Sequence, residues 1–293
     1  TILGTSNRGN PFAYPVVENG NTVVKDVSAQ LLENVRKLAV DALVVVGGDG
    51  TMKIGLELFR RGAPLVGVPK TIDNDLSATE ITFGFDTALH TATDAIDKLH
   101  STAESHHRVM LVEVMGRDTG WIALHAGIAG GADVILIPEI PFALARICAK
   151  IEERARTGRL FSIVVVAEGC RTMDGQPLNA ADTERRQTPR SGEIANIIGG
   201  WIARETHRET RVTVLGHIQR GGSPSPFDRV LSTRLGVAAV DLIAQGKFGY
   251  MACLRCASIE STPIERAVGA LKVVDPQGEL VRTARAVGIS FGD

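Results

Sequence analysis

The chain has 293 residues, of which 44% are hydrophobic, and its formal net charge at pH 7 is -1. A chain of this length and composition can bury a large core, in one or two domains. The near-neutral charge does not favour non-specific binding to nucleic acid, and no apolar run approaches the about 18 residues that span a bilayer. We therefore expect neither nucleic acid nor a membrane among its partners, and no signal peptide is visible.

Four cysteines are too few for a disulfide scaffold in a chain of this length, which favours a reduced, cytoplasmic setting. They are Cys148, Cys170, Cys253 and Cys256. The last two form a single CxxC without a second pair, so a zinc or redox role is an alternative. We expect small buried thiols instead.

Apolar residues recur at helical spacing in some stretches and form short β-branched runs in others. In chain order, the predicted elements are helix 23–38, strand 42–46, helix 54–59, strand 65–68, helix 82–99, strand 109–114, helix 121–129, strand 134–137, helix 144–156, strand 163–166, helix 193–206, strand 211–215 and helix 227–244. This alternation predicts an α/β fold with mostly parallel sheets. The run 42–46 is typical of a strand buried on both faces, and the long polar insert 171–192 predicts a surface excursion.

Two loops with distinct chemistry follow the first two of these strands. GGDGT, residues 47–51, is glycine-rich, and PKTIDND, residues 69–75, is rich in carboxylates. Loops at the carboxyl ends of parallel strands face one crevice, and glycines followed by a helix start suit a phosphate. Asp49 can hold Mg²⁺ beside phosphate oxygens, and Asp73 can take a proton from a sugar hydroxyl. The alternative is a tight βα turn and a solvated carboxylate loop.

Further along, polar side chains that suit a sugar phosphate stand at or just after strand ends. Arg117, Arg211 and Arg220 provide planar, permanently charged groups that match phosphate. His217 can donate to the same phosphate, and Glu168 can accept hydrogens from sugar hydroxyls. Taken singly, a surface arginine usually forms a weak ion pair and a lone histidine is more often structural. Their common position favours a site.

GGDGT followed by PKTIDND resembles the phosphofructokinase family. MGRDTGW at 115–121, VVVAEG at 164–169 and VLGHIQRGGSPSPFDR at 214–229 match motifs of the same family. The resemblance runs from Thr1 to Gly222 and more loosely to Asp293. Family members carry a first strand and a glycine-rich loop before the segment that matches Thr1 to Arg8, so we expect that an amino-terminal segment is missing here.

The resemblance implies two Rossmann-like three-layer domains with mostly parallel sheets and an active site in the cleft between them. We expect a phosphoryl-donor domain of residues 1–84 and about 219–275. The fructose 6-phosphate domain would then comprise about 85–218 and the C-terminal tail.

On the acceptor side, the resemblance implies that Asp73 is the catalytic base, with Thr71 and Arg117 as further catalytic residues. The implied substrate-binding residues are Thr71, Ile72, Asp73, Arg108, Met115, Gly116, Arg117, Glu168, Arg211, His217 and Arg220. Among these, Arg108 and Arg211 match arginines that family members contribute from a neighbouring subunit. The resemblance therefore implies a homo-oligomer, a dimer or typically a tetramer.

On the donor side, the implied nucleotide-binding residues are Arg8, Gly48, Asp49, Gly50, Thr51 and Lys70, with Asp49 at the Mg²⁺. ATP-dependent members have glycine where Gly50 stands, whereas pyrophosphate-dependent members usually have an aspartate that would repel the α-phosphate of ATP. Lys70 favours pyrophosphate, because the pyrophosphate enzymes have lysine there. Since the combination of Gly50 with Lys70 occurs among ATP-dependent members, we expect ATP.

The implied activity is transfer of the γ-phosphoryl group of ATP to the 1-hydroxyl of fructose 6-phosphate, a glycolytic reaction. Three alternatives stay open. The first is a pyrophosphate-dependent phosphotransferase, and the second is a catalytically silent subunit that binds sugar phosphate and regulates. The third is a lipid or NAD kinase that shares GGDGT, against which PKTIDND and MGRDTGW argue.

Overall fold

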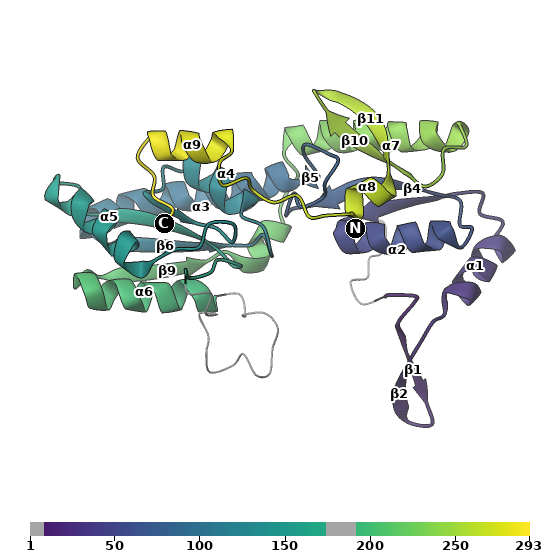
Figure 1. Cartoon of the computed structure of the whole chain (residues 1–293), viewed down its shortest axis with the longest axis horizontal. Coiled ribbons are helices and arrows are strands. Elements are labelled where there is room, and N and C mark those ends of the chain that lie inside the picture. The colour runs from purple at the N-terminus through teal and green to yellow at the C-terminus, as the bar shows by residue number, and fades with distance from the viewer. Residues whose placement is uncertain (1–8, 174–191) are drawn as a thin grey trace. The chain divides into compact units, whose positions relative to one another are not determined.

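The computed structural model describes residues 9–173 and 192–293 (Figure 1). Contacts divide the chain into two compact units. The first unit comprises the described residues up to Lys70, Leu76–Glu80 and Ser232–Leu271, and the second comprises Thr71–Asp75, the described part of Ile81–Leu231, and Lys272–Asp293. The units differ from the predicted domains in that 71–75, 81–84, 219–231 and 272–275 belong to the second unit. The predicted domain roles remain predictions.

The first unit contains a mainly parallel sheet with the strand order β11-β10-β4-β3. Its strands are β3 (Leu43–Gly47), β4 (Leu65–Thr71), β10 (Tyr250–Arg255) and β11 (Ser258–Pro263). β4 pairs in parallel with β3 and β10, and β11 returns antiparallel to β10. Helices α2 (Asp49–Arg60) and α8 (Ile264–Val268) contribute Met52, Leu58, Ile264 and Ala267 to the core of this unit.

Strand β3 is not buried on both faces, which corrects the prediction for 42–46. Val44 and Val46 are 44% and 48% exposed. Val45, which points to the other face, packs with the core that includes Met52 of α2. β3 is the edge strand of its sheet, and an apolar β-branched run can therefore occur with only one face covered.

The predicted helix 23–38 is also wrong at its start. Residues Tyr14–Glu18 (β1) and Asn21–Lys25 (β2) form an antiparallel hairpin, seen in purple in Figure 1. Asn19 and Gly20 at its tip both have positive φ, the geometry that a two-residue hairpin turn requires. Helix α1 begins only at Ser28 and ends at Lys37. Val23 satisfies both a helical and an alternating pattern, and the turn chemistry decides between them.

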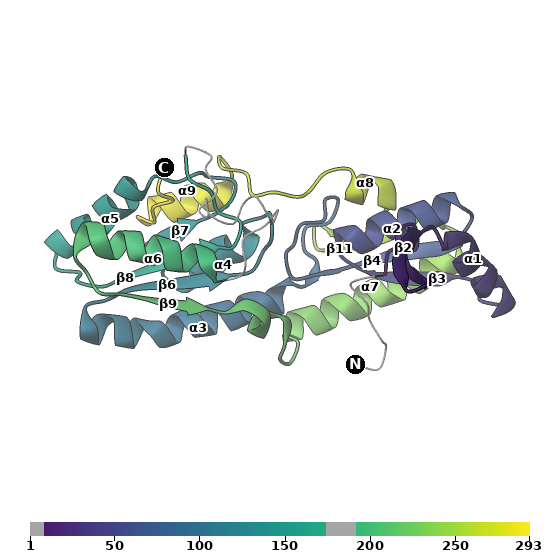
Figure 2. The same cartoon turned by 90° about the horizontal axis from the view of Figure 1, so that it is seen from below.

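The second unit has three layers around a fully parallel sheet with the strand order β7-β8-β6-β9. The strands are β6 (Val109–Val114), β7 (Val134–Leu136), β8 (Ser162–Ala167) and β9 (Thr210–Val214). Helices α3 (Phe85–His106), α4 (Trp121–Ala129) and α9 (Glu279–Ala286) cover one face. Helices α5 (Leu144–Arg156) and α6 (Glu193–Thr206) cover the other, which faces the viewer in Figure 2.

The central strand β6 illustrates how the sequence builds these layers. All six of its residues are buried. Met110, Val112 and Val114 pack with α3 and α4, while Val109 and Leu111 pack with α5 and α6. Successive side chains of a strand point to opposite faces, so a run that is apolar except for the buried Glu113 fits a sheet covered by helices on both sides. The predicted α/β class with mostly parallel sheets is confirmed.

Several element ends differ from the predictions. Helix α3 starts at Phe85 rather than at 82, because Gly84 before it has a φ of 102°. It continues to His106 and ends at the left-handed residue His107.

Helix α7 (Pro226–Ala244) matches its prediction closely. The predicted excursion 171–192 lies mostly outside the described residues. Among the described helices, none has both the length and the apolar character that crossing a bilayer requires.

Candidate active site

The carboxylate loop at the end of β4 is buried rather than solvated. Thr71, Asp73, Asn74 and Asp75 are all less than one tenth exposed. The side chain of Ile72 packs in the core of the second unit, so a contact of this residue with substrate would have to use its main chain. The alternative of a solvated loop is therefore wrong, and the loop belongs to the interior of the second unit.

Asp73 occupies the environment expected of a general base. Its N–H donates to Thr71 Oγ1 at 3.1 Å, and its carbonyl oxygen accepts from Thr119 Oγ1 at 3.2 Å. The carboxylate oxygen Oδ1 is buried without a hydrogen-bond partner among the described residues. Burial, followed by repulsion from Asp75, raises the pKa of Asp73 to about 6. A carboxylate tuned in this way can accept a proton near neutral pH.

The electrostatic surroundings of Asp73 include three other predicted site residues. Arg220 and Arg117 lower its pKa, and Glu168 raises it. All three lie after the ends of strands in the parallel sheet of the second unit. The structure therefore brings these motifs, which are far apart in sequence, into one electrostatic environment.

The loop after β6 adopts a conformation that its residues hold only with support. Gly116 has a φ of 148° and Arg117 a φ of 53°. A Cβ on Gly116 would lie 2.6 Å from the carbonyl oxygen of Thr119, so this position requires glycine. Glu168 Oε1 accepts the N–H of Arg117 at 2.8 Å and that of Gly116 at 3.3 Å. Glu168 thereby fixes the loop from which the Arg117 guanidinium extends.

Gln219 supports the same loop and was absent from the sequence-based prediction. It is 1% exposed, and its Oε1 accepts the N–H of Met115 at 2.8 Å. It belongs to the short 3-10 helix η1 (Gly216–Arg220), which leaves His217 and Arg220 exposed. The available signal was its position in HIQRGG, between two predicted site residues. A glutamine that is buried at such a position needs a hydrogen-bond partner, and here the partner is the Met115 N–H.

Arg108 and Arg211 lie at the amino ends of strands β6 and β9, opposite to the strand ends that carry the site loops. Arg108 precedes β6, and Arg211 is the second residue of β9. Both pair with Glu209, and the Arg108 contact measures 3.0 Å. Since the Asp73 and Arg117 loops follow strand ends, the structure does not bring these two arginines to them within the second unit.

In the first unit, the glycine-rich turn opens directly into helix α2. Gly48 is the extended N-cap residue, and Asp49 begins the helix. A Cβ at Gly47 would lie 2.5 Å from the side chain of Thr51, whereas one at Gly50 would meet nothing within 4 Å. The unpaired N–H groups of a first helical turn favour an anion such as phosphate. Lys70 is exposed at the end of β4, and Arg8 lies outside the described residues.

Asp49 supplies one carboxylate and no more. Its Oδ2 lies 2.8 Å from Lys53 Nζ. Within residues 9–173 and 192–293, no group of three or more His, Cys, Asp or Glu side chains is arranged to hold a metal ion. Because Mg²⁺ is commonly bound by one or two carboxylates together with substrate phosphates, this donor set suits a nucleotide-bound Mg²⁺.

The cysteines are free thiols. Cys170 and Cys253 are buried as predicted, but Cys256 is exposed and Cys148 is partly so. Cys256 and Ala257 form the turn between β10 and β11, both with positive φ. The CxxC therefore spans a hairpin turn, and burial raises the pKa of Cys253.

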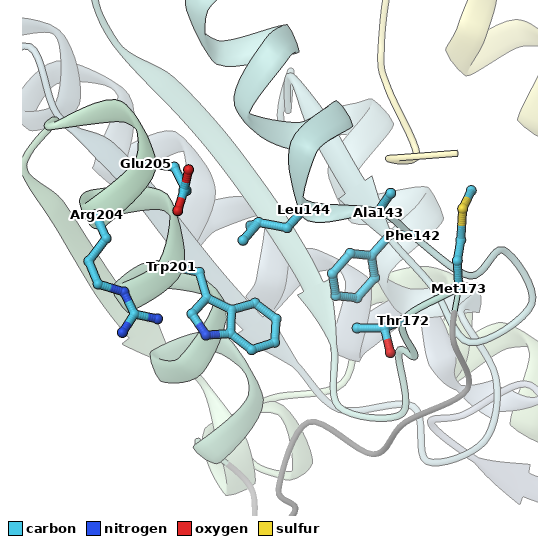
Figure 3. Close-up of a pocket in the computed structure, with 8 residues that line it drawn as sticks. All are labelled: Phe142, Ala143, Leu144, Thr172, Met173, Trp201, Arg204 and Glu205. Atoms are coloured by element: carbon cyan, nitrogen blue, oxygen red, sulfur yellow. The ribbon is translucent and has the colours of Figure 1, made fainter.

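A separate pocket of about 530 Å³ lies between α5 and α6 in the second unit (Figure 3). Its lining residues are Phe142, Ala143, Leu144, Thr172, Met173, Trp201, Arg204 and Glu205. None of them is a predicted site residue.

The fold and these loops define a class of α/β phosphotransferase, and comparison with known proteins identifies the family. A family model described as phosphofructokinase matches residues 1–243. The ATP-dependent 6-phosphofructokinase 2 of Clostridium perfringens is 52% identical over 299 residues, which cover 100% of this chain and 81% of that protein. The ATP-dependent 6-phosphofructokinase of Chloroflexus aurantiacus is 52% identical, with 100% and 80% covered. The chain belongs to the phosphofructokinase family.

Solved structures agree with this assignment. The phosphofructokinase of Saccharomyces cerevisiae has 30% identity and a TM-score of 0.71, covering 83% of this chain and 34% of that one. A pyrophosphate-dependent phosphofructokinase from Marinobacter aquaeolei has a TM-score of 0.74 at 23% identity, covering 90% and 68%. At that identity the likeness shows the shared fold alone.

Proposed function

We propose that the protein transfers the γ-phosphoryl group of ATP to the 1-hydroxyl of fructose 6-phosphate, giving fructose 1,6-bisphosphate. The observation that carries this proposal is the buried Asp73, whose pKa is raised to about 6 within the field of Arg117, Arg220 and Glu168. The relatives at 52% identity over the whole chain are named ATP-dependent 6-phosphofructokinases. A tuned base beside arginines suits attack by a hydroxyl on a phosphate.

In the proposed mechanism, Asp73 takes the proton of the 1-hydroxyl as that oxygen attacks the γ-phosphorus in line. Arg117 offsets charge on the transferred group. Glu168 keeps the Arg117 loop in its left-handed conformation through the Arg117 N–H, and its second oxygen can accept from the sugar. His217 and Arg220, both exposed on η1, bind the 6-phosphate, and Met115 and Gly116 line the same pocket.

The donor binds at the glycine-rich turn of the first unit. The N–H groups at the start of α2, where Gly48 is the N-cap and Gly50 and Thr51 stand in the first helical turn, contact its phosphates. Lys70 and Arg8 are further donor-binding residues in the sequence-based assignment. Asp49 is the protein carboxylate that would hold Mg²⁺. When bound, that ion supplies neutralisation of the phosphate charge. Gly50 leaves open space where a side chain would stand, which supports a donor with an α-phosphate.

We further propose that the protein works as a homo-oligomer. The support is the position of Arg108 and Arg211, which face Glu209 at the amino ends of their strands. Arginines in that position can serve the sugar-phosphate site of a neighbouring copy. Size-exclusion chromatography with light scattering tests this association directly.

The test of the function is a donor comparison on the purified protein, with fructose 6-phosphate as acceptor and Mg²⁺ present. Formation of fructose 1,6-bisphosphate is followed with ATP and, separately, with pyrophosphate. Turnover with ATP supports the proposal. Turnover with pyrophosphate alone would assign the protein to the pyrophosphate-dependent class, and binding of fructose 6-phosphate without turnover would make it a silent regulatory subunit.

A further inference from the structure

The loop that carries Asp73 is held by a side-chain network centred on the next residue. Asn74 is 3% exposed and has a φ of 53°. Its Oδ1 accepts the N–H of Thr82 at 3.1 Å and a hydrogen from Lys272 Nζ at 3.0 Å. Thr82 Oγ1 donates to the carbonyl oxygen of Thr71 at 2.8 Å. The amide of Asn74 thus closes the loop on itself and also connects it to a distant part of the chain.

Lys272 makes further contacts through both its main chain and its side chain. Its N–H donates to the carbonyl oxygen of Asp75 at 2.9 Å. Its own carbonyl oxygen accepts Trp121 Nε1–H at 2.7 Å, and its Nζ lies 5.3 Å from the centroid of the Trp121 ring. One residue therefore contacts both residues that follow Asp73.

Trp121 also connects Lys272 to the loop that contains Arg117. It is the first residue of α4 and directly follows the MGRDTG loop that contains Arg117. Thr119 of that loop donates to the carbonyl oxygen of Asp73. The loop of the base and the loop of the arginine are consequently joined twice, through Thr119 and through Lys272 with Trp121.

We propose that Lys272 is a positioning residue for phosphoryl transfer, which acts through Asn74 to hold the Asp73 loop in register with the Arg117 loop. The inference rests on the proposed function. The contacts of this lysine with Asn74 Oδ1, with the carbonyl oxygen of Asp75 and with Trp121 all act on the position of the loop, so the proposed role is geometric. Small misplacements of a reacting group can cost about 10²-fold in rate, and a residue that fixes the base should therefore affect kcat more than substrate binding.

The experiment is a double-mutant cycle with Lys272→Met and Asn74→Gly. Methionine keeps an unbranched apolar stem without the ammonium, and glycine tolerates the left-handed backbone of residue 74 without the amide. Each single variant should lower kcat by about tenfold or more, with the KM for fructose 6-phosphate within about twofold. The double variant should lose clearly less than the two single losses combined, because both variants remove the contact between Lys272 Nζ and Asn74 Oδ1. Lys272→Arg should restore most of the activity.

Lys98→Met is the matched control. Lys98 is an exposed lysine on α3 whose ion pair among the described residues is with Asp94. The kcat of this variant should equal that of the parent. Thermal unfolding is measured for every variant, and Asn74→Gly keeps the test open if Lys272→Met fails to fold. A kcat within twofold of the parent in both single variants, or losses that add in the double variant, would overturn the positioning role. An inactive parent would instead refute the proposed function, a result that no Lys272 variant can produce.

Discussion

Glu168 accepts the main-chain N–H of Arg117 at 2.8 Å, across 51 positions of sequence. Left-handed backbone is costly for residues other than glycine. The contact with Glu168 explains how Arg117 is held at a φ of 53°. The carboxylate of Glu168 therefore has two proposed roles, one toward the sugar and one toward the arginine loop. Both depend on the strand ends of β6 and β8 lying side by side.

The first prediction concerns the base. Asp73→Asn keeps the shape of the side chain and removes the proton acceptor, so kcat should fall by about 10² to 10⁴. Binding of fructose 6-phosphate should change far less, and steady-state kinetics with calorimetry measure both. The pKa of Asp73 is raised by burial, so the parent at pH 7 carries a buried charge that the variant lacks. The variant should therefore unfold at the same or a higher temperature, and near-normal turnover would remove Asp73 from the mechanism.

The second prediction concerns pH. The base works only when it is ionised, and with a pKa of about 6 it is protonated progressively as the pH falls below that value. The value of kcat/KM should therefore decline below about pH 6. A phosphate monoester also titrates at about pH 6, so a substitution is needed to assign the decline. Glu168→Gln removes a negative charge that raises the pKa of Asp73, and the decline should then move to lower pH.

The free substrate cannot respond to that substitution. Glutamine retains an oxygen that can accept the N–H of Arg117, so the loop should remain in place. A decline that stays at the same pH in Glu168→Gln would mean that it reports the substrate or another group.

Sequence patterns predicted the second unit well and the hairpin of the first unit badly. The run 109–114 became β6 without a change of boundary, because helices cover both faces of this strand and bury its five apolar residues. Val23 and Val24, in contrast, fit a helical stripe as well as a strand. The Asn19–Gly20 turn decided the outcome, and with both valines at least 40% exposed no core contact signals the hairpin.

The motifs predicted most residues now seen around Asp73, but not the contacts that hold them. Trp121 and Lys272 are separated by 151 positions and Asn74 and Lys272 by 198. No local spacing encodes such a pair, because each depends on the C-terminal segment returning to the β4 loop. The burial of residues 71–75 was equally invisible, since a run of charged and polar residues normally faces solvent.

The third prediction concerns recognition of the sugar phosphate. Arg220→Ala removes a charge-assisted contact, and the affinity for fructose 6-phosphate should weaken by about 1.5 to 3 kcal/mol. The KM for the nucleotide should stay nearly unchanged. Because Arg220 lowers the pKa of Asp73, the acidic decline of kcat/KM should also move to higher pH. Arg156→Ala, at an exposed arginine of α5, is the control and should change neither quantity. A rise in the nucleotide constant alone would reverse the assignment of the two substrates.

The fourth prediction concerns the choice of donor. Gly50 lies in the first turn of α2, and a Cβ there meets no atom within 4 Å. Gly50→Asp should therefore fold normally, and acidic residues in a first helical turn are favourable. Any loss of activity must then come from repulsion between the new carboxylate and the bound nucleotide. Two like charges about 4 Å apart repel by about 4 kcal/mol at a near-surface effective dielectric, so ATP-dependent turnover should fall by about several hundred-fold or more.

Pyrophosphate has no α-phosphate to meet that carboxylate, and the family resemblance associates a lysine at the position of Lys70 with pyrophosphate as donor. Gly50→Asp should therefore spare or even reveal turnover with pyrophosphate, which a coupled assay with each donor measures. Gly200→Asp is the matched control, because Gly200 is also a helical glycine with nothing within 4 Å of its Cβ position. It should leave turnover with both donors unchanged. If the unmodified protein prefers pyrophosphate while it carries Gly50, the repulsion argument fails, and Lys70 is the residue that marks the donor.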